Sequence, residues 1–372
     1  MINPKLRGVD DIVHTVTAVA SSSSLESAQS FIRDVIAPSQ PQEVVPCAAY
    51  GSYEEIFNNG HMFDILYIST PHSHHFQNCM CALNAGINVV CEKPLTVNSK
   101  QARLLYEVAR SRNLFLMEAV WTRFFPLSIA VRDLITSNAI GEVLRVYVNN
   151  STGVDVETLE PTHRYLNKDL AGGALLDIGV YALTWLFQCL YHTNEVAHRR
   201  APSDLMSIVT LHEPSQTDQM VSMVMKFTRL NGREAHGIAT ASMILPDADD
   251  GAQDRSMAGG PTVHIYGLDG EVQVFGPAHR PQWIKVVPKV GKGKVRTIDF
   301  EIPAGGHGMF WEADAAARCV RDGKLECETV PWQESIHVME VMDKIREGTH
   351  LVYPHELETT EYPVQLSLKR TN

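Results

Sequence analysis

The first third of the chain alternates short apolar segments with polar, amphipathic ones, and this rhythm constrains the fold more than any other feature. Rich in β-branched and other apolar residues, the short segments read as strands: Val13–Ala20, Ile65–Ser69, Asn88–Cys91 and Leu114–Met117. Helical patterns separate them, and Ser23 and Ser52 carry the spacing of helix-starting capping boxes. Regular alternation of strand and helix predicts a Rossmann-like, doubly wound parallel sheet.

The rhythm changes after about Gly141, where residues begin to alternate with a period of two. The predicted strands that follow are Leu205–Leu211, Met220–Phe227, Glu234–Leu245, Thr262–Gly267, Glu271–Phe275, Ile284–Val287 and Val295–Phe300. Few helices separate them, so an α+β domain with a large, mostly antiparallel sheet is expected. We place the domains at 1–125 and 126–372, with the C-terminal helices packing back towards the first domain.

Composition excludes several classes of protein. The chain of 372 residues has a formal charge of −11, which disfavours nucleic acid and anionic membranes as partners. Its uninterrupted apolar runs are far shorter than the ~20 residues that span a bilayer. The first residues lack the apolar core of a signal peptide. Seven cysteines, an odd number in a long chain, indicate reduced thiols, so a cytoplasmic protein is expected.

Three motifs stand on the loops that this topology predicts. Thr70-Pro71-His72-Ser73-His74-His75 has the form T-P-x-x-x-H, Glu92-Lys93-Pro94 forms an E-K-P turn, and Gly172–Tyr181 reads GGALLDIGVY. Together and in this order, they resemble the glucose–fructose oxidoreductase and inositol dehydrogenase (Gfo/Idh/MocA) family of NAD(P)-dependent sugar oxidoreductases. The resemblance covers nearly the whole chain from Asn3 onward.

Further segments are similar to one branch of that family, the dimeric dihydrodiol dehydrogenases with the NADP-dependent D-xylose 1-dehydrogenases. These segments are Tyr50–Glu55, Leu116–Pro126, Gly308–Ala313 and Pro331–Ser335. The resemblance implies a homodimer joined through the antiparallel sheet. It also implies NADP-dependent oxidation of an aldopyranose, such as D-xylose at its C1 hydroxyl to the lactone, or of a cyclic trans-dihydrodiol. A sister polyol dehydrogenase remains an alternative.

The resemblance also assigns a catalytic group. Asp177 and Tyr181 are four residues apart and share one helix face, which the family pattern turns towards the nicotinamide. We expect Tyr181 to act as acid and base, Lys93 to lower its pKa and bind the substrate hydroxyl, and Asp177 to orient them. Trp121 is expected to wall the substrate pocket. The structural alternative is that Lys93 lies at the surface while Asp177 and Tyr181 only cap and pack.

Cofactor contacts are expected along the same edge. The second strand of such a sheet normally ends in an acid that binds the ribose 2′-hydroxyl, but here it ends in serines, which favours NADP over NAD. The related branch often has an arginine there, which this chain lacks. The residues expected to contact the cofactor are Ser21, Ser22, Thr70, Pro71, His72, His75, Glu92, Lys93, Trp121 and Arg123. The histidines around Thr70 with Cys79 and Cys81 lack a known ligand spacing, so no metal is expected.

One expected feature is absent from the sequence. A dinucleotide-binding sheet normally opens with a strand, a G-x-G-x-x-G turn and a helix, and no G-x-G-x-x-G occurs. The segment Asn3–Asp10 resembles the end of that helix, so Val13–Ala20 would be the second strand. We therefore expect a domain without its first strand, turn and helix. One hypothesis is a late start within a longer protein, with weak NADPH binding; another is a cofactor-deficient, non-catalytic family member.

Overall fold

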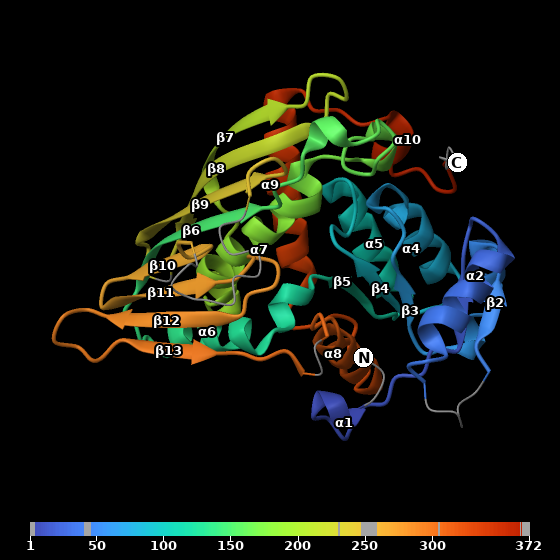
Figure 1. Cartoon of the computed structure of the whole chain (residues 1–372), viewed down its shortest axis with the longest axis horizontal. Helices are drawn as coiled ribbons and strands as arrows, with labels where there is room; N and C mark the ends of the chain where they lie inside the picture. The colour runs from blue at the N-terminus through green and yellow to red at the C-terminus, as the bar shows by residue number, and fades with distance from the viewer. Residues whose placement is uncertain are drawn as a thin grey trace.

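The computed structural model describes residues 4–40, 46–229, 231–246, 259–303, 306–364 and 366. Figure 1 shows a large sheet on one side of the molecule and a smaller α/β region on the other, with helices between them. The expected combination of a parallel, Rossmann-like region and a mostly antiparallel sheet is confirmed.

The parallel strands form two separate sheets. β3 (Leu66–Ile68), β4 (Val89–Glu92) and β5 (Leu116–Ala119) make one, and β1 (Ala18–Ala20) and β2 (Ala48–Tyr50) make the other. All their pairings are parallel. β1 is shorter than the predicted strand Val13–Ala20, and β2 was not predicted.

Helices follow these strands as the sequence pattern predicts. They are α2 (Leu25–Phe31), α3 (Tyr53–Asn58), α4 (His75–Asn84) and α5 (Ser99–Ser111). The Ser52 side chain accepts a hydrogen bond from Glu55 N at 3.2 Å and caps α3 as predicted. The prediction for α2 was one residue early, because Ser24 rather than Ser23 caps it by accepting from Ser27 N at 3.1 Å.

The large sheet has eight strands in the order β13-β12-β11-β10-β6-β9-β8-β7. Their bounds are β6 Val143–Ser151, β7 Ser203–Leu211, β8 Asp218–Thr228, β9 Glu234–Ser242, β10 Val263–Gly267, β11 Gly270–Phe275, β12 Trp283–Pro288 and β13 Arg296–Asp299. Only the β6–β9 pair is parallel among these described strands. The alternating sequence pattern therefore predicted this sheet well.

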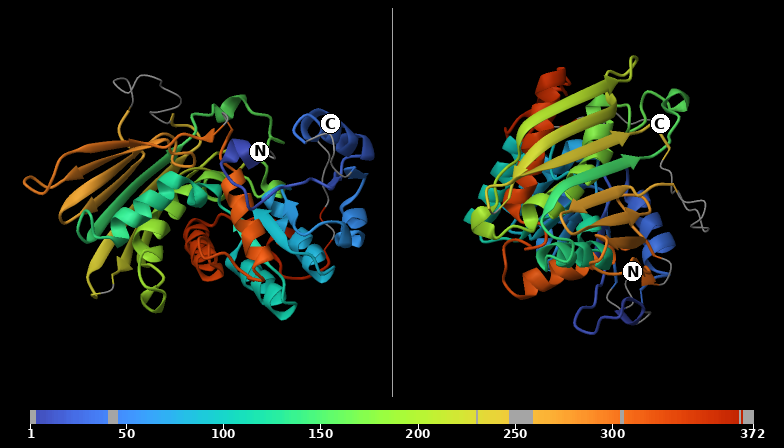
Figure 2. Two further views of the ribbon diagram at one scale, coloured as in Figure 1. Left: turned by 90° about the horizontal axis from the view of Figure 1, so that it is seen from below. Right: turned by 90° about the vertical axis from the view of Figure 1, so that its left-hand side faces the viewer.

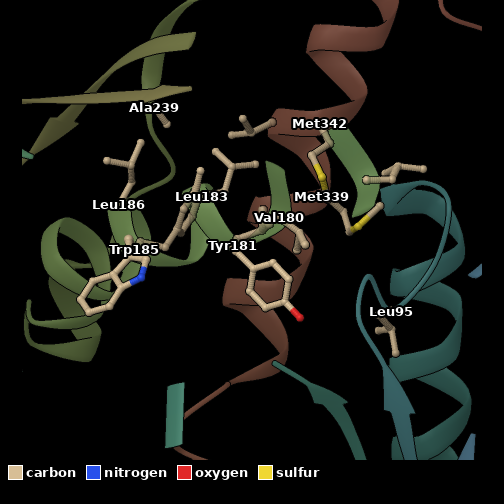
Figure 3. Packing of buried hydrophobic residues seen from close by; sticks show 14 of the residues in the cluster. Leu95, Val180, Tyr181, Leu183, Trp185, Leu186, Ala239, Met339 and Met342 are labelled. Atoms are coloured by element: carbon tan, nitrogen blue, oxygen red, sulfur yellow. The ribbon is translucent and has the colours of Figure 1, made fainter. Parts of the chain in front are cut away.

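One apolar helix forms the centre of the core. α7 (Val180–Phe187) lies within a helical stretch that begins at Leu175 and ends at His192, and every residue of α7 is buried. It packs against the sheet on one side and α9 on the other, as Figure 3 shows for Leu186 near Ala239 and Val180 near Met339. The stretch Lys168–His192 is long and apolar enough to span a membrane, but 94% of its most apolar window is buried inside the protein. It is thus a core helix.

One of the remaining helices of the described residues, α9, ties the C-terminal part of the chain to the parallel strands and their helices. These remaining helices are α1 (Pro4–Arg7), α6 (Pro126–Thr136), α8 (Phe310–Arg321), α9 (Trp332–Thr349) and α10 (His355–Glu358). α9 packs on α5, where the Trp332 ring stacks on Tyr106 with centroids 5.0 Å apart. The Trp332 indole also donates to Leu116 O at 2.7 Å, so the C-terminal part of the chain is tied to β5. The described residues also form short helical turns at Ile32–Ile36, Gly60–Met62, His72–His74, Trp121–Phe124, Val156–Thr158, Lys168–Leu170, Leu175–Gly179, Gln188–His192 and Val196–His198.

Candidate active site at the carboxyl ends of the parallel strands

The loops after β3 and β4 are tied together by one buried histidine. The two ring nitrogens of His75 lie 2.8 Å from Pro94 O and 2.8 Å from Thr70 O. Burial lowers the pKa of His75 to about 4, so the ring is neutral at pH 7 and donates to one of these carbonyls at a time. The T-P-x-x-x-H and E-K-P segments therefore meet at one edge, as their positions after parallel strands predict.

Lys93 reaches from this edge to the amino end of the core helix. Its Nζ donates to Asp177 O at 2.6 Å and to Asp177 Oδ1 at 3.0 Å. Both side chains are largely buried. Burial lowers the pKa of Lys93, but the neighbouring Tyr181 and Asp177 raise it, and the net shift is upward. Lys93 is thus a charged, fixed group and not the surface lysine of the structural alternative.

A second cation meets the same carboxylate from a different loop. Arg164 donates to Asp177 Oδ2 at 3.0 Å and to Oδ1 at 3.3 Å, and its guanidinium lies over the Tyr165 ring. Burial raises the pKa of Asp177, but Lys93 and Arg164 lower it more, so the carboxylate stays ionised. Sequence reasoning did not give Arg164 this role, because no motif marks it.

The phenol of Tyr181 is held between an indole and an ammonium group. Trp121 Nε1 donates to the Tyr181 hydroxyl oxygen at 2.7 Å, and Lys93 Nζ lies 4.7 Å from the Tyr181 ring centroid. His279 packs beside both aromatic rings, with centroids 5.6 Å from Tyr181 and 6.2 Å from Trp121. No sequence motif marks His279, because it lies in a loop between β11 and β12.

This geometry leaves the phenol able to move a proton. An indole N–H can only donate, so the Tyr181 oxygen accepts from Trp121 and keeps its own hydrogen for another acceptor. Burial raises the pKa of Tyr181 to about 12, and the nearby Lys93 opposes that rise. A neighbouring cation of this kind stabilises the ionised form of a phenol.

A buried carboxyl group shapes the turn that leads into the core helix. Asp218 Oδ2 accepts from Leu175 N at 2.5 Å, and Tyr353 donates to Gly172 O at 2.9 Å. Gly173 has φ +134°, and a Cβ there would lie 1.9 Å from Asp218 Oδ1. Close packing against Asp218, a residue that sequence reasoning missed, therefore requires the second glycine of the GGALLDIGVY motif, whereas the first, Gly172, packs against the backbone of Arg164 and Tyr165.

With this geometry in view, similarity to known proteins identifies the family. Residues 9–120 match the family description "Oxidoreductase family, NAD-binding Rossmann fold" (Gfo/Idh/MocA), and residues 129–273 match the "GFO/IDH/MocA C-terminal domain". The chain belongs to the Gfo/Idh/MocA oxidoreductase family. The resemblance carried by the three motifs is thereby confirmed.

Several members of the Gfo/Idh/MocA family are close relatives. The chain is 43% identical over 383 residues to "D-xylose 1-dehydrogenase (NADP(+))" of Hypocrea jecorina, covering 100% of this chain and 93% of the relative. It is 30% identical to human "Trans-1,2-dihydrobenzene-1,2-diol dehydrogenase", covering 92% and 91%. Among solved structures, a levoglucosan dehydrogenase in complex with NADH and levoglucosan shares the fold, with a TM-score of 0.72, 18% identity and coverage of 91% and 89%.

The other residues expected to contact the cofactor follow strands of both parallel sheets. His72 is buried, with Nε2 2.6 Å from Ala171 O. Glu92 accepts from the Tyr67 hydroxyl and from Lys93 N. Ser21 and Ser22 follow β1 in the other parallel sheet, where Ser22 Oγ donates to the Tyr53 hydroxyl at 3.3 Å. Within the described ranges, no group of three histidine, cysteine or acidic side chains is placed to hold a metal.

Arg123 is buried and joins the turn after β5 to α9. Its guanidinium is buried, pairs with Glu334 of α9 and donates to Thr329 O at 2.6 Å. His192 Nδ1 lies 2.8 Å from the other Glu334 oxygen. The guanidinium of Arg123 thus pairs with a carboxylate that lies far along the chain, and its contact with the cofactor stays a prediction.

The substitution Arg123→Met tests this packing role. It leaves the Glu334 carboxylate buried without its main partner, which costs about 3–5 kcal/mol in the free energy of unfolding measured with urea. The matched control is Arg33→Met, because the Arg33–Asp34 pair is exposed and its loss changes stability by less than about 1 kcal/mol. Equal, small effects of the two substitutions would contradict the assignment.

Proposed function

We propose that the protein is an NADP-dependent dehydrogenase that oxidises a CH–OH group of an aldopyranose, such as the C1 hydroxyl of D-xylose, to the lactone. The observation that carries this proposal is the Tyr181 hydroxyl, buried beside Lys93 and held by Trp121 at the ligand edge of the parallel strands. The names of the relatives support the substrate class. A cyclic trans-dihydrodiol is the second candidate substrate, favoured by the dihydrodiol dehydrogenase relatives.

The chemistry divides between the cofactor and the protein. Bound NADP would supply the acceptor for the hydride of the substrate carbon. Tyr181 accepts the hydroxyl proton at Oη, and in the reverse direction it returns that proton. Lys93 stabilises the phenolate and orients the substrate hydroxyl, while Asp177 fixes Lys93 through two hydrogen bonds. Arg164 donates to Asp177 as well, so two cations face this one carboxylate, and its guanidinium lies over the Tyr165 ring.

The side chains present fit NADP at its expected 2′-phosphate end and at its expected nicotinamide end. Hydroxyls of Ser21 and Ser22 stand where an acid would repel a 2′-phosphate. Thr70, Pro71 and Glu92 line the loops next to Lys93. The sequence contains no G-x-G-x-x-G motif, so a cofactor-deficient, non-catalytic protein is the competing proposal. Binding of NADPH, measured by its fluorescence, distinguishes a dehydrogenase from a cofactor-deficient protein. A panel of D-xylose, D-glucose and a dihydrodiol as substrates then distinguishes a sugar or diol dehydrogenase from a sister polyol dehydrogenase.

We further propose that the large sheet joins two copies in a homodimer. Figure 2 shows helices on one face of this sheet only. On the other face Met206, Val224, Ile238 and Tyr147 are direct cross-strand neighbours, so they form one apolar row across β7, β8, β9 and β6. Met206 is 68% exposed and its neighbour Ile208 75%. Such a row indicates a protein interface.

Two broader assignments accompany the function. We retain a division into a cofactor domain up to residue 125 and a substrate and dimerisation domain from residue 126, since the family matches end at 120 and resume at 129. The protein is assigned to the cytoplasm, because all seven cysteines are free thiols.

Replacing the acid and base tests the mechanism. Lys93→Met and Tyr181→Phe should each lower kcat for sugar oxidation by about 10²–10⁴, because each removes a group that acts on the transferred proton. The dissociation constant of NADPH should change little. Lys100→Met, which removes an exposed lysine, serves as the control and should keep full activity. Turnover like that of the unmodified protein in either active-site variant rules out the assignment.

The pH dependence of oxidation provides a second test. Oxidation needs the deprotonated form of Tyr181, whose pKa is raised to about 12 by burial. The value of kcat/KM for oxidation should therefore rise by about tenfold per pH unit from pH 7 to 10. Lys93→Met removes the charge that opposes the rise in pKa, so its activity should be lower at each pH. A plateau below pH 9 in the unmodified protein would show that Tyr181 is not the base.

The dimer proposal is tested by charging the exposed row. Ile208→Lys places an ammonium in the proposed interface and should convert a dimer to a monomer in light scattering at micromolar concentration. Val290→Lys is the control, because Val290 is fully exposed at the turn between β12 and β13. A monomer before any substitution contradicts the proposal.

A further inference from the structure

The turn that carries Lys93 is held by side chains from two other elements. Pro94 O lies 2.8 Å from His75 Nδ1 of α4, and Leu95 N donates to Glu118 Oε1 of β5 at 3.0 Å. Lysine has a long, flexible side chain, so the place of its ammonium group depends on where the backbone of its turn is fixed. The contacts of Pro94 and Leu95 fix the two residues that follow Lys93.

The parallel sheet brings Glu118 next to this turn. β5 pairs with β4 so that Glu118 lies opposite Cys91, two residues before Lys93. Glu118 is 3% exposed and Leu95 0% exposed, so water does not reach the hydrogen bond between them. A buried amide that loses its acceptor stays unsatisfied, which is costly. The Leu95 amide therefore depends on the carboxylate of Glu118.

α9 holds the same carboxylate from its other side. The Ser335 hydroxyl donates to Glu118 Oε2. Burial raises the pKa of Glu118, while the hydrogen bonds from Ser335 and Leu95 oppose that rise. Both carboxylate oxygens accept, one from the turn after β4 and one from α9. Glu118 thus has one fixed orientation, set by two donors that are 240 positions apart in the sequence.

We propose that Glu118 is a positioning residue of the dehydrogenase, which acts on the reaction through Lys93 by holding the backbone of the turn at Leu95. This inference rests on the proposed function. Lys93 Nζ must lie close to both Asp177 and Tyr181 to stabilise the phenolate and orient the substrate hydroxyl. A displacement of about 1 Å in such a group costs up to about 10²-fold in rate.

Two substitutions of Glu118 test whether its acceptor oxygen matters. Glu118→Met is similar in volume and cannot accept, so it should lower kcat by about 10-fold to 10²-fold with little change in the dissociation constant of NADPH. Glu118→Gln keeps a carbonyl oxygen for Leu95 N, and its amide can donate to the Ser335 hydroxyl, so kcat should stay within about threefold. A loss in Glu118→Gln as large as that in Glu118→Met overturns the proposal.

A matched control removes a similar hydrogen bond farther from Lys93. Asp343 of α9 accepts from Ser99 N, at the start of α5, at 2.9 Å. Asp343→Met also deletes a carboxylate that holds a backbone amide, but that amide lies six residues after Lys93, so kcat should stay within about threefold. Equal losses in Asp343→Met and Glu118→Met overturn the proposal, because they indicate a general loosening of the chain.

A double-substitution cycle tests whether Glu118 acts through Lys93. Glu118→Met should lower kcat by about tenfold or more in the unmodified protein, but by less than about twofold when Lys93 is already Met. A residue with only a structural role lowers kcat by the same factor in both backgrounds. That outcome overturns the proposal.

The same cycle measured on unfolding needs neither cofactor nor substrate. Lys93→Met breaks the ion pair with Asp177, so it should raise the equilibrium constant of unfolding in urea. This rise should be at least about fivefold smaller in the Glu118→Met background, where the pair is already weakened. Equal rises in the two backgrounds overturn the proposal. If the unmodified protein oxidises no sugar or diol, the proposed function fails, while the unfolding cycle still decides whether Glu118 positions Lys93.

Discussion

A buried ion pair between Lys93 and Asp177 joins the two halves of the protein. Lys93 belongs to the turn after β4 of the small parallel sheet, whereas Asp177 begins the core helix that packs on the large sheet. Taking two charges out of water is costly, and here it is offset by several hydrogen bonds to one carboxylate and to its backbone oxygen. The same contacts fix the distance between the strand edge and the helix face. The candidate site therefore depends on the docking of the two halves.

The fold was largely predictable because its determinants are local. The strand near Asn88–Cys91 is an apolar run of the kind that a fully buried parallel strand requires, and it was found almost at its true bounds. β2 was missed, since Ala48, Ala49 and Tyr50 offer a short segment with no β-branched residue. The strand that ends at Ala20 was predicted to begin at Val13, five residues before the start of β1, because the β-branched residues of that segment favour a strand.

The candidate site was predictable in its chemistry but not in its full membership. Lys93, Asp177 and Tyr181 lie on motifs, and the structure brings them together. The pairing of Arg123 with Glu334 was not predicted, because the two residues are 211 positions apart, a separation that no local pattern reveals. His279 was not predicted either, because it reaches the site from an irregular loop that is distant in sequence. Long-range pairing of polar side chains is thus the part of the site that the sequence does not display.

The contact between Gly173 and Asp218 links two positions that are distant in sequence. Asp218 Oδ1 occupies the space that any side chain at position 173 would need, while Asp218 Oδ2 accepts the first free amide of the core helix. A larger residue at 173 requires a smaller one at 218, and a smaller one at 218 leaves that amide without its acceptor. A side chain at position 173 and the carboxylate of Asp218 therefore exclude each other, and a substitution at either position disturbs the start of the core helix.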